Sequence, residues 1–496
     1  MRCTFIYSRW KMLASGSPYC IDADSSDDLP INERYSYEKR GSFLLTELLS
    51  NLEVGLKGFM SSTDSWRNLG DVKAVFYFNR TDISDKVSKR WNEDSFFGYQ
   101  YLNGVNPMLI RKCLNLPENF PVTSSMVAAS LGISTDLQKE LQNGNVFLAD
   151  YKILQGIPIK DSINGKRQYM TVPMCLLWKD PQDKLLPIAI QLGQTPGEQT
   201  PIFLPSDSEW DWTLAKIWVR NAEYQVHQTI SHLLQSHLFA EVFTMATHRQ
   251  LPRNHPVYKL LIPHLRYTLD INTLAKKEVA GSGGTFDQIL VLSKKGVRAL
   301  VRRAMEELTY SALCLPEDIK ARGLESIPNY FYRDDGQMIW EAMERCRIPS
   351  SLETMSSLVR YLTMVIFRCS AQHAAVNSGQ FDFYAWMPNG PPSIKSPPPT
   401  AKGVTTIQTI LDALPDVKTT TTSVVSVWQL SKEPQDQRRL GCYPDEHFTE
   451  ETPQIFILEF QEKLSEISKI INERNQTRSL PYPYLDPEVI ENSVSI

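Results

Sequence analysis

Three of the eight histidines in this chain recur at five-residue steps within one apolar segment. They are His227, His232 and His237 in the run His-Gln-Thr-Ile-Ser-His-Leu-Leu-Gln-Ser-His. Helical periodicity extends over residues 212 to about 251, where apolar side chains recur at three- and four-residue steps: Leu214, Ile217, Trp218, Val226, Ile230, Leu233, Leu234, Leu238 and Val242. The pattern predicts one long, largely buried helix.

The five-residue spacing constrains the geometry of this helix. Residues five apart on an α-helix diverge by about 140°. Two such histidines reach one metal only if the helix gains an extra residue locally, as in a π-bulge, a feature that tends to mark functional sites. The alternative is that all three are ordinary polar residues of a buried helix.

Composition excludes several classes of protein. A net charge of −4 gives no reason to expect a nucleic-acid partner. The eight cysteines are scattered without a Cys-x-x-Cys pair, which is typical of reduced thiols in a cytosolic protein. The first 13 residues do not form a signal peptide, and no apolar run is long enough to span a bilayer. We therefore expect a cytoplasmic protein.

The remaining pattern predicts a mainly α fold with a small β patch. Three β-like runs at 146–154, 169–178 and 186–192 are expected to pair in one small sheet. Helices are expected at 38–60, 126–141, 257–275, 294–310, 335–345, 352–377, 406–414, 422–430 and 454–475. The proline-rich stretch 379–399 is expected to cross the molecule without helix. Residues 1–35 are polar and irregular and are interpreted as the remnant of an interdomain linker that precedes a single domain, 36–496.

Two further segments carry candidate metal ligands. His373 and Asn377 close the very apolar helix expected at 352–377 and, four residues apart, lie within about 40° of each other on its surface. A core histidine bonded to a backbone carbonyl is the alternative interpretation. The chain ends on Ile496, and an apolar last residue can carry its carboxylate inward, where a metal would neutralise it.

These residues resemble the animal lipoxygenases. The similarity runs in order through Trp218-Val-Arg-Asn, Ala246-Thr-His-Arg-Gln-Leu-Pro, Arg266-Tyr-Thr-Leu, Ala371-Gln-His-Ala-Ala-Val-Asn, Trp386-Met-Pro-Asn, Pro397-Pro-Pro-Thr and the closing Glu491-Asn-Ser-Val-Ser-Ile. Together with Asp445-Glu-His-Phe-Thr-Glu-Glu, the closing motif is most similar to the epidermis-type members, which are hydroperoxide isomerases.

The resemblance implies a single large helical domain around the long histidine helix, with one non-haem iron. The implied ligands are His232, His237, His373, Asn377 and the carboxylate of Ile496, and His227 becomes their neighbour. This set leaves one position open and suits iron cycling between Fe(II) and Fe(III); zinc prefers four tetrahedral ligands. His248, His255 and His264 are expected to be structural, and His447 to be exposed.

The implied reaction is hydrogen abstraction from the 1,4-pentadiene of a polyunsaturated fatty acid such as arachidonate or linoleate, followed by insertion of dioxygen. The iron-bound hydroxide is the reactive group, so no catalytic side chain is expected beside it. The implied substrate-binding residues are Leu233, Leu238, Ala275, Lys276, Val279, Ile289, Leu290, Leu430 and, at the entrance, Phe43. Ala275 indicates S-type oxygenation, and Lys276 is either a tether for the substrate carboxylate or a solvated surface lysine.

The sequence departs from the family pattern in two places. The N-terminal β-sandwich of most animal members is expected to be absent, although peripheral membrane contact stays open. The segment between Trp340 and Leu362 is much shorter than the family pattern. Three interpretations follow: a dioxygenase that makes fatty-acid hydroperoxides, an isomerase that converts them to epoxyalcohols, or an inactive truncated form that only binds lipid.

Overall fold

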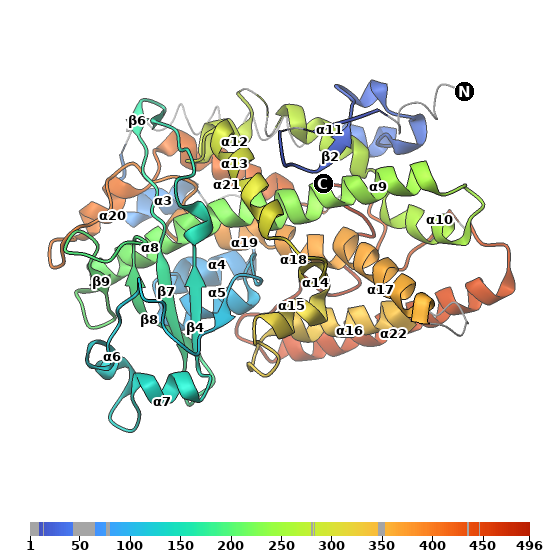
Figure 1. Ribbon diagram of the computed structural model, residues 1–496. Coiled ribbons are helices and arrows are strands. Elements are labelled where there is room, and N and C mark those ends of the chain that lie inside the picture. The colour runs from blue at the N-terminus through green and yellow to red at the C-terminus, as the bar shows by residue number, and fades with distance from the viewer. Residues whose placement is uncertain are drawn as a thin grey trace.

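A helical rod through residues 209–250 crosses the whole molecule (Figure 1). It consists of α8 (Glu209–Val226), a π-helical segment η5 (His227–Leu238) and α9 (Phe239–Gln250). Nearly every residue from 211 to 238 is buried, as the apolar periodicity predicts. The computed structural model describes residues 9–12, 14–42, 65–75, 80–278, 281, 283–345, 353–433, 436–445 and 447–496.

Many of the other helices lie around the rod (Figure 1). Before it in the chain come α3 (Leu69–Val75), α4 (Asp82–Arg90), α5 (Asp94–Asn103), α6 (Ser124–Leu131) and α7 (Leu137–Gln142). After it come α10 (Pro256–Leu261), α11 (Thr268–Glu278), α12 (Thr285–Ile289), α13 (Lys294–Glu307), α14 (Tyr310–Leu313), α15 (Leu315–Ala321), α16 (Phe331–Arg345), α17 (Glu353–Phe367), α18 (His373–Asn377), α19 (Gln380–Tyr384), α20 (Ile407–Ala413), α21 (Val417–Ser431) and α22 (Glu451–Gln476). The mainly α prediction is confirmed.

The expected small sheet is also present. Its order is β3 (Arg111–Lys112), β4 (Val146–Asp150), β7 (Met174–Lys179), β8 (Leu185–Gln191) and β9 (Ile202–Phe203), with every pair antiparallel. Helix α5 packs so closely on β8 that a Cβ on Gly98 would lie 1.8 Å from the carbonyl oxygen of Leu185. Side chains from α6 and α7 cover residues of β7 such as Met174 and Leu176.

Three of the expected segments differ in the structure. The single helix expected at 126–141 is divided into α6 and α7, and Gly132 adopts φ +79° where α6 ends. The single helix expected at 257–275 is wrong: α10 ends in a short 3-10 turn that contains Pro263, and Tyr267 adopts φ +66° before α11 begins. Proline lacks the N–H that an α-helix interior needs, so the chain turns there. The crossing at 379–399 is not free of helix, because α19 occupies its first residues.

The N-terminal segment folds onto the rod. Strands β1 (Trp10–Met12) and β2 (Tyr19–Ile21) form a hairpin, and the backbone N–H of Ile21 donates to Glu241 of α9 at 2.7 Å. Ile21 and Leu29 pack against Met245 and Leu269. Residues 37–42 are helical, and the rest of the helix expected at 38–60, Phe43 included, lies outside the described residues. Within the described part of the chain, no helix combines the length and apolarity that crossing a bilayer requires.

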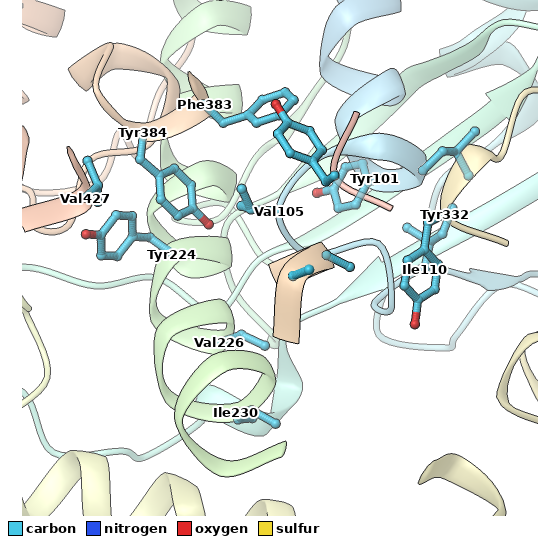
Figure 2. Packing of buried hydrophobic residues seen from close by; sticks show 14 of the residues in the cluster. Tyr101, Val105, Ile110, Tyr224, Val226, Ile230, Tyr332, Phe383, Tyr384 and Val427 are labelled. Carbon is cyan, nitrogen blue, oxygen red and sulfur yellow. The ribbon is translucent and has the colours of Figure 1, made fainter. Parts of the chain in front are cut away.

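The large hydrophobic core includes the junction between the rod and the helices that follow it. Tyr224 of α8 packs on Tyr384 of α19 with ring centroids 4.6 Å apart (Figure 2). Figure 2 also shows Val226 and Ile230 on successive turns of the same rod, where α8 passes into η5. This packing fixes the rotation of the rod about its axis, so each histidine that follows has a defined direction.

Candidate metal centre

The π-helical segment η5 brings two of the spaced histidines to one place. A π-helix closes its hydrogen bonds between residues five apart, so residues at that spacing lie on the same face of the helix. His232 and His237 lie with their Nε2 atoms 3.3 Å apart. The extra residue predicted from the spacing is thus confirmed, as a π-helical run of 12 residues.

A second π-helical segment delivers the third histidine. Helix α17 passes into η7 (Arg368–Gln372), and His373 follows at once as the first residue of α18. The buried Arg368 fixes η7, because its guanidinium donates to the carbonyls of Leu313 (2.8 Å) and Ala312 (2.7 Å) at the end of α14. The sequence gives no periodic signal for this second π-helix.

The three imidazoles converge. One ring nitrogen from each of His232, His237 and His373 lies within 4.8 Å of the other two, and all three residues are buried. The ring of His237 is nearly perpendicular to that of His373, at 85° with centroids 5.2 Å apart. Nitrogens at such separations can surround one metal ion, for which metal–imidazole distances are about 2.0–2.1 Å in the zinc case.

The electrostatic state of the rings also fits a metal. Burial lowers the pKa of His237 to about 4, and the pKa values of His232 and His373 lie well below their usual range for the same reason, reinforced by the neighbouring imidazoles. The rings are therefore neutral at physiological pH, as metal binding requires. Nε2 of His373 is buried and has no hydrogen-bond partner, a costly arrangement that a cation would relieve.

Asn272 of α11 orients His237. Its side-chain N–H donates to the backbone oxygen of His237 (2.8 Å) and to Glu241 (2.8 Å), so its carbonyl oxygen faces Nδ1 of His237 at 2.9 Å. Nδ1 must then carry the proton and Nε2 must present its lone pair to the cluster. Hydrogen bonds of this kind fix the tautomer of metal-binding histidines. Sequence reasoning missed Asn272, because 35 residues separate it from His237.

Asn377 lies at the edge of the cluster. A hydrogen bond with its side chain opposes the lowered pKa of His232. Its amide donates to the carbonyl of Leu430 (2.7 Å), and its Oδ1 accepts from Gln380 (2.8 Å). Gln380 in turn accepts from Gln228 of the rod at 2.6 Å. This relay connects the two ligand-bearing helices and holds the amide oxygen of Asn377 on the side of His232.

The chain end reaches the same place. The backbone of Ile496 interacts with the imidazole of His373 and opposes the lowering of its pKa. The preceding residues are buried, from Asn492 to Ser495. The residues expected to bind the metal thus belong to η5, α18 and the C-terminus.

Most of the other histidines have protein partners. Nε2 of His227 lies 2.8 Å from the carbonyl oxygen of Val376, and His264 contacts the backbone oxygen of Asn492 and the hydroxyl of Tyr443. His255 caps α10 through the N–H of Val257. His447 is exposed.

The expected substrate-binding residues fall into three groups. Leu238, Ile289 and Leu290 are buried, whereas Leu233, Leu430 and Ala275 are partly exposed. Lys276 is not a solvated surface lysine, because its ammonium forms an ion pair with the buried Glu241 at 2.7 Å. Val279, like Phe43, lies outside the described residues.

Comparisons with known proteins agree with this architecture. A lipoxygenase family model matches residues 50–348 and 347–482. The human polyunsaturated fatty acid lipoxygenase ALOX15B is 49% identical, and the match covers 98% of this chain and 78% of the relative. The mouse hydroperoxide isomerase ALOXE3 is 48% identical, with 98% and 80% covered. The alignment with the human relative spans 528 positions, more than the 496 residues of this chain, so the relative contains residues that are missing here.

Solved structures show the same fold. A lipoxygenase crystallised anaerobically in complex with arachidonate superimposes with a TM-score of 0.94 at 33% identity, over 98% of this chain and 79% of that one. A calcium-dependent 11R-lipoxygenase gives a TM-score of 0.92 at 32% identity, over 100% and 80%. With the family model, the relatives and the histidine cluster in agreement, the chain belongs to the lipoxygenase family.

Proposed function

We propose that this chain is a non-haem iron enzyme that oxygenates polyunsaturated fatty acids. The observation that carries the proposal is the buried convergence of His232, His237 and His373 in a member of the lipoxygenase family. Asn377 and the terminal carboxylate of Ile496 would complete the ligand set. Three imidazoles, one amide and one carboxylate suit iron better than zinc.

Iron in this position would supply the one-electron oxidation that hydrogen abstraction from a bis-allylic carbon requires. The residues of the chain supply the rest. Asn272 holds the lone pair of His237 towards the centre, and the relay from Gln228 through Gln380 holds Asn377. The apolar side chains of Leu233, Leu238, Ile289, Leu290 and Leu430 are proposed to line the substrate channel and to exclude water from a substrate radical.

The position of Ala275 supports oxygenation of the S type, and that assignment is part of the proposal. Lys276 can approach a substrate carboxylate only if it gives up its ion pair with Glu241. Dioxygen is the proposed co-substrate. The inactive alternative finds no support in the relatives, which are named as enzymes.

A second reaction is favoured by one specific finding, the 48% identity with a hydroperoxide isomerase. An isomerase would rearrange a fatty-acid hydroperoxide to an epoxyalcohol with the same donor residues. Identity does not separate the two reactions, because the two relatives are almost equally similar to this chain.

Oxygen uptake separates the candidates. The iron-loaded chain is given either arachidonate in aerated buffer or a preformed arachidonate hydroperoxide under argon. A dioxygenase consumes oxygen and produces a conjugated diene from the free acid, whereas an isomerase converts the hydroperoxide without oxygen. An iron-loaded chain that does neither contradicts the proposed function.

Removal of Ile496 tests the ligand set. Its carboxylate would be the only anionic protein ligand, so the truncated chain should fail to retain iron after gel filtration. Iron content is measured by atomic emission, and far-ultraviolet circular dichroism checks that the fold persists. Full iron occupancy without Ile496 would show that the terminal carboxylate is not a ligand.

A further inference from the structure

The last residues of the chain are held by side chains from near its beginning. The hydroxyl of Tyr35 donates to the backbone oxygen of Ser495 at 2.9 Å, and the ammonium of Lys39 donates to the Ser495 hydroxyl at 3.2 Å. More than 450 residues separate these partners in sequence. Ser495 directly precedes the residue whose carboxylate is proposed to bind iron, so these contacts act one residue away from a ligand.

The ammonium group of Lys39 is enclosed by the protein. Its side chain is only 4% exposed, and the ammonium lies 3.8 Å from the Asp436 carboxylate. The rings of Tyr35 and Tyr267 flank it, with centroids 5.5 and 5.9 Å away. A buried lysine is costly unless it is paired, so the arrangement of carboxylate and rings indicates a specific role for this charge.

The Asp436 carboxylate connects this site to the fold. It also accepts from Arg266 (2.9 Å), from the hydroxyl of Tyr267 (3.1 Å) and from that of Ser36 (3.2 Å). The start of α11, residues 35–39 and the chain end therefore meet in one network.

The rest of the C-terminal segment is anchored independently. Leu440 donates to the carbonyl of Ile490 (2.9 Å), and Asn492 donates to the carbonyl of Arg438 (2.7 Å). Thr268 donates to the backbone oxygen of Val494 at 3.2 Å. None of these hydrogen-bond partners belongs to residues 35–39, and Lys39 also attracts the buried Glu491 electrostatically. The hydrogen bonds of Tyr35 and Lys39 to this segment both end on Ser495.

We propose that Tyr35 and Lys39 are positioning residues that hold Ser495 so that the carboxylate of Ile496 faces the three histidines. The inference rests on the proposed ligand role of Ile496. It makes residues 35–39 part of the machinery that loads and retains the metal, although neither side chain touches the metal. The hydroxyl of Tyr35 fixes the backbone, and Lys39 fixes the side chain of the same residue.

Susceptibility of the metal-free full chain to carboxypeptidase Y measures this role directly. Loss of one charge-assisted hydrogen bond should raise the open population of the final two residues by roughly tenfold or more. Lys39→Met should therefore release Ile496 and Ser495 at least about tenfold faster, as seen by intact mass, and cleavage should stop at Val494. Lys39→Arg, which keeps the charge, should restore most of the protection.

Two further variants test whether faster cleavage could result from a general loss of stability. Lys216→Met removes another lysine that is 4% exposed, one that pairs with Asp94 and does not contact the C-terminal segment, and it should leave the cleavage rate unchanged. Tyr35→Phe deletes a single hydroxyl and should accelerate cleavage by a smaller factor. Both Lys39→Met and Tyr35→Phe should also lower the iron content of the loaded protein.

The outcomes separate this inference from the proposed function. Cleavage of Lys39→Met at the wild-type rate, or equal acceleration in Lys216→Met, overturns the positioning role. Faster cleavage together with full iron, both in Lys39→Met and in the chain without Ile496, refutes the ligand role and with it the connection to the metal. Faster cleavage with reduced iron in both Lys39→Met and Tyr35→Phe supports the proposal.

Discussion

Replacement of Asn272 by alanine should weaken metal binding without removing any ligand. The side chain makes three hydrogen bonds, to Nδ1 of His237, to the backbone oxygen of His237 and to Glu241. Without them the His237 ring loses both its fixed orientation and its fixed tautomer. Loss of such a partner typically costs 10–100-fold in metal affinity, which corresponds to about 1.4–2.7 kcal/mol.

The assay is an anaerobic titration of iron-free protein with Fe(II) against a chelator of known affinity. Thr273→Ala is the matched control, because Thr273 is the next residue of α11 and its hydroxyl donates only within that helix, to the Leu269 carbonyl at 2.8 Å. Unpaired buried groups will also lower the free energy of unfolding of Asn272→Ala by roughly 1–3 kcal/mol. An Fe(II) affinity equal to that of the control would refute the orienting role of Asn272.

Three further predictions concern pH, packing and charge. Burial lowers the pKa of His264 to about 4, so between pH 6.5 and 4 the unfolded chain binds a proton that the folded chain does not. The free energy of unfolding should therefore fall by up to about 3 kcal/mol over this range. Urea titrations at several pH values should show that this free energy depends less steeply on pH in His264→Gln. Gly98→Ala forces a Cβ against a carbonyl of β8 and should lower the melting temperature by several degrees. Gly197→Ala should leave the melting temperature unchanged, because a Cβ at that position would meet no other atom within 4 Å. Lys276→Met removes the ion-pair partner of the buried Glu241, which keeps its hydrogen bonds from the Ile21 backbone and from Asn272, and should cost up to about 3 kcal/mol of stability. The ratio of KM between fatty acid and methyl ester should not change; a changed ratio would indicate that Lys276 tethers the substrate carboxylate.

The sequence predicted those parts of the site that lie on one continuous element. Apolar periodicity located the rod, and the five-residue spacing of His232 and His237 required a local π geometry, because ordinary α-helix places such residues on different faces. Helical spacing and the apolar chain end made His373, Asn377 and Ile496 candidates, and the resemblance to known lipoxygenases then joined them to His232 and His237 in one ligand set. The three imidazoles converge in the structure, and Asn377 and the backbone of Ile496 each interact with one of them.

The parts that could not be predicted depend on tertiary contacts. Asn272 acts on His237, which is 35 residues away, and Lys39 acts on Ser495, which is 456 residues away, and no periodicity records such a pairing. The second π-helix before His373 follows from packing of Arg368 on α14, which is equally invisible in sequence. The break at Pro263 had a local signal, but the apolar pattern on either side of it masked the turn.

Because of the π-helical segments η5 and η7, the geometry of the metal site depends more on the number of residues in these helices than on their chemical identity. Each contains surplus backbone relative to the α-helix on either side of it. Deletion of a single residue between His232 and His237 would let the rod return to regular winding and would place the two rings about 40° apart on one face of an α-helix, at a spacing of four residues. The same deletion would rotate everything beyond it by about 100°. Insertion or deletion of one residue in either helix would therefore turn the side chains that follow it towards different parts of the core. Insertions and deletions should be tolerated far less here than substitutions.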